Sequence, residues 1–369
     1  MQRSILVDEH EARGAQLASR PEAPDLPAAL TYGDVPAEYR AAREGCIVLD
    51  DTDRGAVRVG GSEAEVFLHR LLANDARGLE PGGGNRNLLL SSKGKVQHDF
   101  DLFREPDGFS ISAAPGDGAK LLTGLDLYLF TEDVQLEDTG AASAPISLCG
   151  PAALRIAQAV VGGRLDLADY GGGGHAWEER AFDGAPVRVS SLPVAGSAGV
   201  RLDPGPAKAT DLWRALIEAG ASPAGVAVRD ILRVEAGAAL FGVDINDEIY
   251  PQEARLEAAF SLDKGCYIGQ EIVAKIDTYG GLNKRLTPLR VANDDPVAGG
   301  TRLLKEEDGE VRDLGVVTSW AYSFVLDTGL VLAYVKRRHQ EPGTTFSLGE
   351  NGPEGTIVRL PVREDAVGA

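Results

Sequence analysis

The sequence predicts an α+β protein of more than one domain that ends in a small β-barrel or sandwich. Its 369 residues suggest roughly two or three domains of ordinary size, and 43% apolar with 25% charged residues is a globular composition. Residues 207–236 carry the apolar spacing of helices. After Arg285, short apolar runs recur between glycine and acidic turns, which is typical of a compact β-structure.

The N-terminal part combines a polar start with one helix and one strand. Residues 1–30 alternate charge, alanine and proline without a continuous apolar segment, so we expect no secretory signal and an exposed, flexible arm. Pro36 precedes a helical pattern over 37–43, and the alternation in 56–59 indicates a half-buried strand.

A capping box predicts the next helix. Ser62 and Glu65 have the spacing of an N-cap serine and an N3 glutamate. We expect the apolar face of this helix to consist of Val66, Phe67 and Leu71.

Two strands and two further helices are predicted before the C-terminal part. The strands cover 87–91 and 96–103 and are joined by a turn at Gly94. The helices cover 207–219 and 226–236, and a glycine follows each of them as a stop signal.

The composition argues against several classes of function. Acidic residues outnumber basic ones by 56 to 37, which disfavours binding to a nucleic acid backbone. Apolar runs are far shorter than the roughly 20 residues that span a bilayer, so we expect no membrane segment. The five histidines show no His-x-x-x-His spacing, and Cys-x-x-Cys is absent, so no metal site is predicted.

The three cysteines indicate a reducing compartment. Cys46, Cys149 and Cys266 are far apart and odd in number, which gives no disulfide framework and predicts a cytoplasmic protein. Cys46 and Cys149 lie in apolar contexts, so we expect both in the core.

Cys266 is different because it lies in the segment KGCYIGQE, residues 264–271. The ammonium of Lys264 favours the thiolate, and Gly265 and Gly269 leave room for another molecule to approach. We therefore interpret Cys266 as a candidate reactive thiol. The alternative is a glycine-bearing turn with Cys266 as a small, half-buried filler.

The same segment resembles the signature of the YgfZ family, folate-binding proteins linked to iron-sulfur cluster assembly and repair. That family is related to the glycine-cleavage aminomethyltransferase, and the resemblance extends over residues 32–362. It is carried by the segments 67–75, 226–237, 314–319 and 333–335.

The resemblance implies a three-domain ring of two interleaved α+β parts and a C-terminal β-barrel around a tetrahydrofolate site. The expected boundaries are an arm over 1–30, α+β parts over 31–140 and 141–284, and the barrel over 285–369. It also implies iron-sulfur client or assembly proteins as partners. Cys266 and Lys264 would act chemically, and the loop would be shaped by Gly265, Tyr267, Gly269, Gln270 and Glu271.

Two departures from the aminomethyltransferase pattern bear on function. The transferase has a pair of acidic residues where this chain has His98 and Asp99, so the first carboxylate is missing. By strand alternation His98 faces the apolar side of its strand, as a satisfied side chain or a substitute base. Ser197 replaces a glutamate that holds the pterin in the transferase, and a serine cannot give a bidentate carboxylate contact.

Arg229 and Arg233 lie four residues apart on one face of the predicted helix over 226–236. Paired guanidinium groups suit the carboxylate tail of a folate. The resemblance favours a folate contact for Arg229. The alternative is internal pairing with Asp230 or Glu235.

Three functions remain open at this level. The first is a YgfZ-like, folate-binding accessory protein for iron-sulfur clusters that uses Cys266. The second is a one-carbon transferase of the aminomethyltransferase type. The third is a folate-binding scaffold without covalent chemistry, for which Cys266→Ser would behave as wild type and Arg229→Ala would not.

Overall fold

The computed structural model of this protein describes residues 4–167 and 174–362. Their contacts divide the chain into two compact units that alternate along the sequence. Unit 1 comprises Met1–Ser91, Gln97–Arg229 and Ala258–Ile268, and unit 2 comprises Ser92–Val96, Asp230–Glu257 and Gly269–Ala369.

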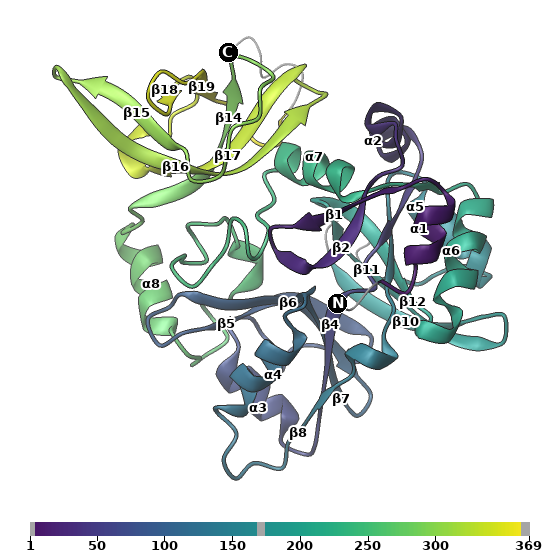
Figure 1. The fold of residues 1–369 in the computed structure, drawn as a ribbon. Coiled ribbons are helices and arrows are strands. Elements are labelled where there is room, and N and C mark those ends of the chain that lie inside the picture. The colour runs from purple at the N-terminus through teal and green to yellow at the C-terminus, as the bar shows by residue number, and fades with distance from the viewer. Residues whose placement is uncertain (1–3, 168–173, 363–369) are drawn as a thin grey trace. The chain divides into compact units, whose positions relative to one another are not determined.

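Unit 1 is organised around one long, mostly antiparallel sheet of eleven strands in the order β13-β3-β9-β12-β11-β10-β5-β6-β7-β4-β8 (Figure 1). The strands are β3 (Ile47–Asp50), β4 (Arg54–Gly60), β5 (Gly83–Leu90), β6 (Val96–Glu105), β7 (Gly108–Pro115), β8 (Gln135–Asp138), β9 (Ile146–Cys149), β10 (His175–Phe182), β11 (Ala185–Val194), β12 (Ser197–Asp203) and β13 (Ser222–Pro223). The expected parts 31–140 and 141–284 share this sheet, because β5 pairs with β10 through Gly84 and His175.

Five helices of unit 1 accompany the sheet: α2 (Val35–Glu44), α3 (Ala64–Leu71), α4 (Gly118–Asp126), α5 (Ala153–Val161) and α6 (Ala209–Glu218). Side chains of α3 and α4, such as Phe67 and Leu121, form one apolar core with Phe100 of β6. Side chains of α5 and α6, such as Trp213, form a second core with Val189 of β11. These cores lie at different parts of the sheet (Figure 1).

The N-terminal segment is not the exposed arm that the sequence predicted. Its described residues form α1 (Val7–Ala12) and the hairpin of β1 (Gln16–Arg20) and β2 (Ala23–Thr31). Leu6 is fully buried, and His10 Nε2 lies 2.8 Å from Asp50 Oδ2. The polar composition was misleading because a few buried residues are enough to attach a short segment.

The predicted capping box at α3 is also wrong. The helix has Glu63 at its N-cap without a side-chain cap bond, and the Ser62 hydroxyl donates to Asp133 instead. Phe67 and Leu71 are buried as expected, but Val66 is 50% exposed. The helix begins one residue later than the box requires, and its buried face is formed by Phe67, Leu68 and Leu71, so Val66 lies outside that face.

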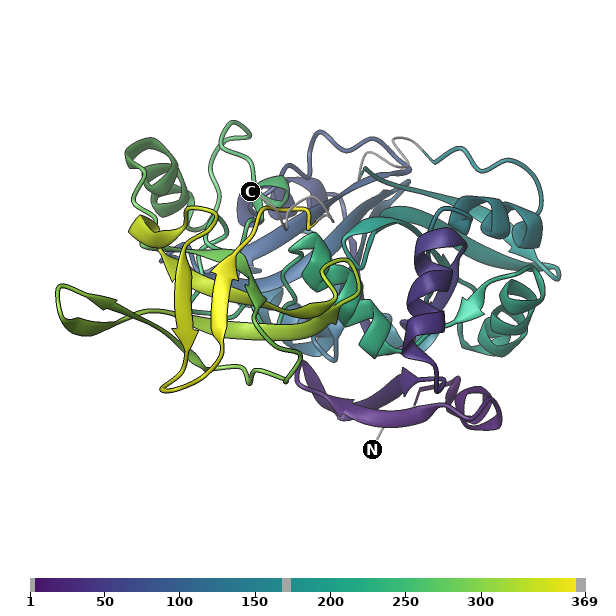
Figure 2. The same ribbon diagram turned by 90° about the horizontal axis from the view of Figure 1, so that it is seen from above.

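Unit 2 contains most of α7 (Val226–Ala236), then α8 (Gln270–Tyr279) and a closed barrel. The barrel order is β14-β17-β16-β15-β18-β19, with the strands β14 (Lys284–Val291), β15 (Arg302–Glu307), β16 (Glu310–Ser323), β17 (Thr328–Lys336), β18 (Thr345–Leu348) and β19 (Glu354–Ile357). These strands are seen from above, in green and yellow, in Figure 2. The predicted C-terminal barrel is confirmed, and α7 has the predicted bounds. Within the described residues, no helix is long and apolar enough to cross a bilayer.

Candidate functional site

Cys266 lies at the surface of unit 1. It is exposed, whereas Cys46 and Cys149 are each only 2% exposed. The prediction that Cys46 and Cys149 belong to the core is therefore confirmed. An exposed thiol can be reached by another molecule, which the half-buried filler could not.

Lys264 is attached to α3 through His69. The Lys264 ammonium donates to the main-chain oxygen of His69, and His69 Nε2 lies 3.0 Å from the main-chain oxygen of Lys264. The ammonium also lies 5.1 Å from the centre of the Tyr267 ring. Burial lowers the pKa of Lys264 to about 8, so the group still carries most of its charge at neutral pH.

The two glycines of the segment have a conformational role in addition to the predicted steric one. Gly265 and Gly269 have φ of 102° and 80°, a region that side chains rarely adopt. Gly269 is the N-cap of α8, so Gln270 and Glu271 begin a helix of unit 2. Glu271 forms an exposed ion pair with Lys275 at 2.6 Å, and its contribution to the loop stays a prediction.

His98 and Asp99 point in opposite directions from β6. His98 Nδ1 lies 2.7 Å from Asp117 Oδ2, and its strand neighbour Phe100 belongs to the core. Asp99 accepts two hydrogen bonds from the Arg86 guanidinium. The bond from Nε to Oδ1 is 2.8 Å long. His98 therefore has an acidic partner inside unit 1, and a folate contact for either residue stays a prediction.

A buried cluster of charged residues lies on the Asp99 face of the sheet. Arg229 Nη2 is 2.9 Å from Asp51 Oδ1, and Arg201 Nη1 is 3.1 Å from Asp101 Oδ2. Arg54 Nη2 lies 3.5 Å from the same Asp101 oxygen. Burial alone would raise the pKa of Asp51, but Arg229 and Arg201 outweigh it and hold that pKa well below its ordinary value.

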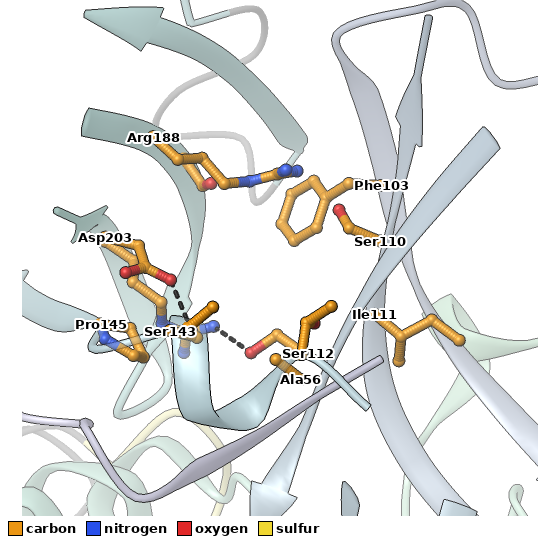
Figure 3. A pocket seen from close by; sticks show the side chains of 13 residues that line it. Ala56, Phe103, Ser110, Ile111, Ser112, Ser143, Pro145, Arg188 and Asp203 are labelled. Atoms are coloured by element: carbon orange, nitrogen blue, oxygen red, sulfur yellow. Dashed lines mark hydrogen bonds between the residues drawn. The ribbon is translucent and has the colours of Figure 1, made fainter. Parts of the chain in front are cut away.

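A cavity of about 220 Å³ opens beside this cluster (Figure 3). The Arg188 guanidinium lies 4.8 Å from the centre of the Phe103 ring, and Figure 3 shows both side chains at one edge of the cavity. The remaining wall is rich in hydroxyl groups, from Ser110, Ser112, Ser143 and Ser190. A second cavity of about 700 Å³ also has Ser143 in its lining.

The lining of the smaller cavity offers hydrogen-bonding groups to a small, polar ligand. Its serine hydroxyls can donate or accept, whereas Phe103 is only 3% exposed and the Arg188 guanidinium lies against the Phe103 and Trp177 rings. A volume of about 220 Å³ is below the range of roughly 300–1,000 Å³ for whole drug-sized ligands. The cavity is therefore too small for a complete folate.

Arg233 does not share the surroundings of Arg229. Its Nη1 lies 2.7 Å from Asp244 Oδ2 and its Nε 2.9 Å from Asp230 Oδ1, both in unit 2. Internal pairing with Asp230 was one of the two alternatives for this residue. Arg229 contacts Asp51 in unit 1, so the two arginines hold different carboxylates although they are neighbours on one helix.

Ser197 begins β12, and its hydroxyl lies 3.3 Å from the Cys149 thiol. Ser197 therefore cannot supply the carboxylate that the transferase has at this position, as the sequence indicated. Among the residues that the structure describes, no group of three or more His, Cys, Asp or Glu side chains could hold a metal ion.

The sequence did not single out Asp51, Arg54, Asp101 or Arg201 as site residues. Their burial could not be predicted, because isolated charged residues in strands or directly beside them are usually exposed. The only usable signal was at Asp101, which alternates with apolar neighbours and shares a strand face with Asp99.

Comparison with known proteins identifies the family. The family of the GCVT N-terminal domain matches residues 6–264, and that of the glycine cleavage T-protein C-terminal barrel domain matches residues 284–361. The chain therefore belongs to the glycine cleavage T-protein family. Aminomethyltransferases of this family use tetrahydrofolate as a substrate or cofactor, which supports the cofactor that the sequence predicted.

Named relatives cover nearly the whole chain. An aminomethyltransferase of Rubrobacter xylanophilus is 32% identical over 98% of this chain and 94% of its own. One of Thermus thermophilus is 30% identical over 85% of this chain and 86% of its own.

The fold is also shared with a solved structure. The crystal structure of aminomethyltransferase T of the glycine cleavage system from Bartonella henselae has a TM-score of 0.85, covers 98% of both chains and is 23% identical. This similarity confirms the predicted fold class, two N-terminal α+β parts followed by a six-stranded barrel.

Proposed function

We propose that this chain is a folate-binding accessory protein of the YgfZ type that works in the cytoplasm and presents Cys266 to iron-sulfur client or assembly proteins. The exposure of Cys266 carries the proposal, because the two other cysteines are buried and cannot serve. Lys264 supports it, since its half-buried ammonium belongs to the same loop and is still mostly charged at neutral pH.

The residues expected at the folate site add indirect support. Ser197 stands where the transferase has a glutamate, and His98 stands at the first position of the acidic pair. The cavity beside Phe103 and Arg188 has hydroxyl groups that could bind a small polar ligand. A chain of this family that lacks two of the transferase carboxylates suits binding better than one-carbon transfer.

The second candidate is a folate-dependent aminomethyltransferase. The relatives favour it, because the Rubrobacter protein carries that name at 32% identity over nearly the full length. In this candidate Asp99 would be the remaining carboxylate near the folate. Its two hydrogen bonds from Arg86 orient the Asp99 carboxylate.

One comparison separates the two candidates. A strain that lacks the gene is complemented with the wild-type chain, with Cys266→Ser or with Cys46→Ser, and iron-sulfur enzyme activities are measured under oxidative stress. The accessory role predicts that wild type and Cys46→Ser restore activity and Cys266→Ser does not. Equal activity in the uncomplemented and complemented strains would exclude it.

The matching assay uses the purified chain. A lipoylated carrier protein loaded with an aminomethyl group and tetrahydrofolate is supplied, and released ammonia and methylenetetrahydrofolate are measured. The accessory role predicts no turnover. Turnover that is retained in Cys266→Ser and lost in Asp99→Asn would establish the second candidate.

A further inference from the structure

The cavity of about 220 Å³ lies between two pairs of strands from distant parts of unit 1. On one side, Phe103 of β6 is paired with Ser110 of β7. On the other side, Ser190 of β11 is paired with Arg201 of β12. Residues that lie opposite each other in paired strands carry their side chains on the same face of the sheet. Figure 3 shows Phe103 and Ser110 at one wall and Asp203 of β12 at the other.

The Ser112 hydroxyl, which also lines the cavity, has only its proton left for a hydrogen bond. Its oxygen accepts from Arg54 Nε at 3.0 Å and from Arg201 Nη1 at 3.2 Å. A serine oxygen has two lone pairs, so these two guanidinium groups use both of them. Within residues 4–167 and 174–362, no oxygen accepts from the Ser112 hydroxyl, which is therefore available as a donor to the cavity.

Arg201 and Ser190 add further donors. The Arg201 side chain is only 9% exposed, and its Nε and Nη1 donate to Ser147 and Asp101. Among the described residues, Arg201 Nη2 and the Ser190 hydroxyl have no hydrogen-bond partner. Ser190 is 4% exposed, and polar groups buried this deeply normally have a partner. These two groups and the Ser112 hydroxyl are therefore donors in need of an acceptor.

The carboxylate in the wall of the cavity is already occupied. Asp203 Oδ1 accepts from the main-chain nitrogens of Ala144 and Gly205 at 2.9 and 3.0 Å. Its Oδ2 accepts from the Ser143 hydroxyl, the bond drawn as a dashed line in Figure 3. A wall with free donors and an occupied acceptor favours a ligand that only accepts, as an oxyanion does.

The surrounding charges favour a ligand with a single negative charge. The guanidinium groups in and beside the wall already have carboxylate partners: Arg188 pairs with Glu105, Arg201 and Arg54 with Asp101, and Arg229 with Asp51. Burial, followed by repulsion from Arg201, lowers the pKa of Arg54 to about 10. One negative charge would relieve this repulsion, whereas a second would be opposed by the fixed carboxylates.

The rest of the lining is apolar and suits a short hydrocarbon body. It consists of Ala56, Phe103, Ile111, Ala142 and Pro145. Ligand sites commonly combine such an apolar wall with a few placed polar groups. A carboxylate with a short chain matches both parts of the lining.

We propose that this cavity is a binding site for a small monocarboxylate, whose oxygens accept from Arg201 Nη2 and from the hydroxyls of Ser112 and Ser190. A carboxylate carries one charge at neutral pH and offers about four acceptor positions on its two oxygens. The site goes beyond the proposed function, because it uses neither Cys266 nor folate.

The test is isothermal titration calorimetry of the full-length chain at pH 7 and constant ionic strength with sodium butyrate, a short monocarboxylate. Butyramide, which has a similar shape without the charge, and inorganic phosphate are titrated in parallel. Butyrate should bind saturably, and butyramide should bind at least about tenfold more weakly because it loses the charge-assisted hydrogen bonds. Phosphate, which carries more charge, should also bind more weakly than butyrate.

Variants of two serines locate the site. Ser190→Ala should weaken butyrate binding by about tenfold, since it removes one hydrogen bond to a charged group. Ser190→Thr keeps a hydroxyl and should recover most of the affinity. Ser110→Ala is the matched control, because the Ser110 hydroxyl lines the same cavity but donates to Glu105 at 2.6 Å. It should change the affinity by less than about twofold.

Three results would overturn the proposal: equal affinity for butyrate and butyramide, tighter binding of phosphate, or a Ser190→Ala affinity equal to that of wild type. Absence of saturable binding to the wild type would mean that water fills the cavity, and would overturn it as well. Cys266→Ser should bind butyrate as the wild type does, so a failure of the accessory role leaves the outcome at this cavity unaffected.

Discussion

Arg229 and Asp51 form a buried ion pair in unit 1, with 2.9 Å between Nη2 and Oδ1. The same guanidinium also donates to the main-chain oxygen of Asp50 at 3.0 Å. Arg229 therefore joins α7 to the end of β3. A folate contact for Arg229 stays a prediction.

Arg229→Ala should destabilise the protein. It leaves the Asp51 carboxylate buried with Arg201, at 3.6 Å, and Arg54 as its cationic neighbours, and we expect a loss of about 2–3 kcal/mol in the free energy of unfolding. Urea titration followed by tryptophan fluorescence measures this loss. The exposed Arg70→Ala should change the value by less than about 0.5 kcal/mol. Equal stability of the two variants would contradict the pairing.

Acid should weaken unit 1 at a defined pH. Burial opposes ionisation of Asp101, but His175, Arg201 and Arg54 outweigh it and hold its pKa well below the ordinary value. A carboxyl with a depressed folded pKa stabilises the folded state above its unfolded pKa of about 3.9, and this contribution is lost as the pH falls further.

We therefore expect the melting temperature to fall steeply below about pH 4, with a shallower slope in Asp101→Asn. Asp107, whose side chain is 72% exposed beside Arg58, provides the matched control as Asp107→Asn. If both variants keep the wild-type slope, Asp101 does not contribute to acid sensitivity.

Lys264→Met should affect the Cys266 thiol only where Lys264 is charged. Burial lowers the Lys264 pKa to about 8, so the wild-type side chain is mostly an ammonium at pH 7 and mostly neutral at pH 9. The variant should be alkylated more slowly at pH 7 by up to about fivefold, as one nearby charge at high dielectric allows.

The difference between Lys264→Met and wild type should shrink as the pH rises to 9. The exposed Lys275→Met should match wild type at each pH. A ratio of rates that stays constant from pH 7 to 9 would show that the effect of Lys264 is steric and not electrostatic.

Gly265→Ala should distort the loop without a steric clash. A Cβ at Gly265 would meet no atom within 4 Å, but φ is 102°, so we expect a cost of about 1 kcal/mol or more from the backbone alone. Gly281 also offers open space and lacks a positive φ, so Gly281→Ala is the control and should be nearly neutral. Thermal unfolding compares the two, and an equal effect would contradict the backbone explanation.

The sequence by itself determined the features that depend on local pattern. The helix at 226–236 and the C-terminal barrel follow from apolar periodicity and glycine turns, because neighbouring residues suffice to set them. The exposure of Cys266 and the burial of Cys149 also agreed with their local contexts.

Only the tertiary structure decided which residues meet. The partners of Arg229 and of Lys264 come from segments far away in sequence, at Asp51 and His69. Residues 258–268 belong to unit 1, although the residues before and after them belong to unit 2. No local sequence pattern predicts this. Such contacts depend on packing between distant segments and on the burial of charge, and a pattern of neighbouring residues carries no information about either.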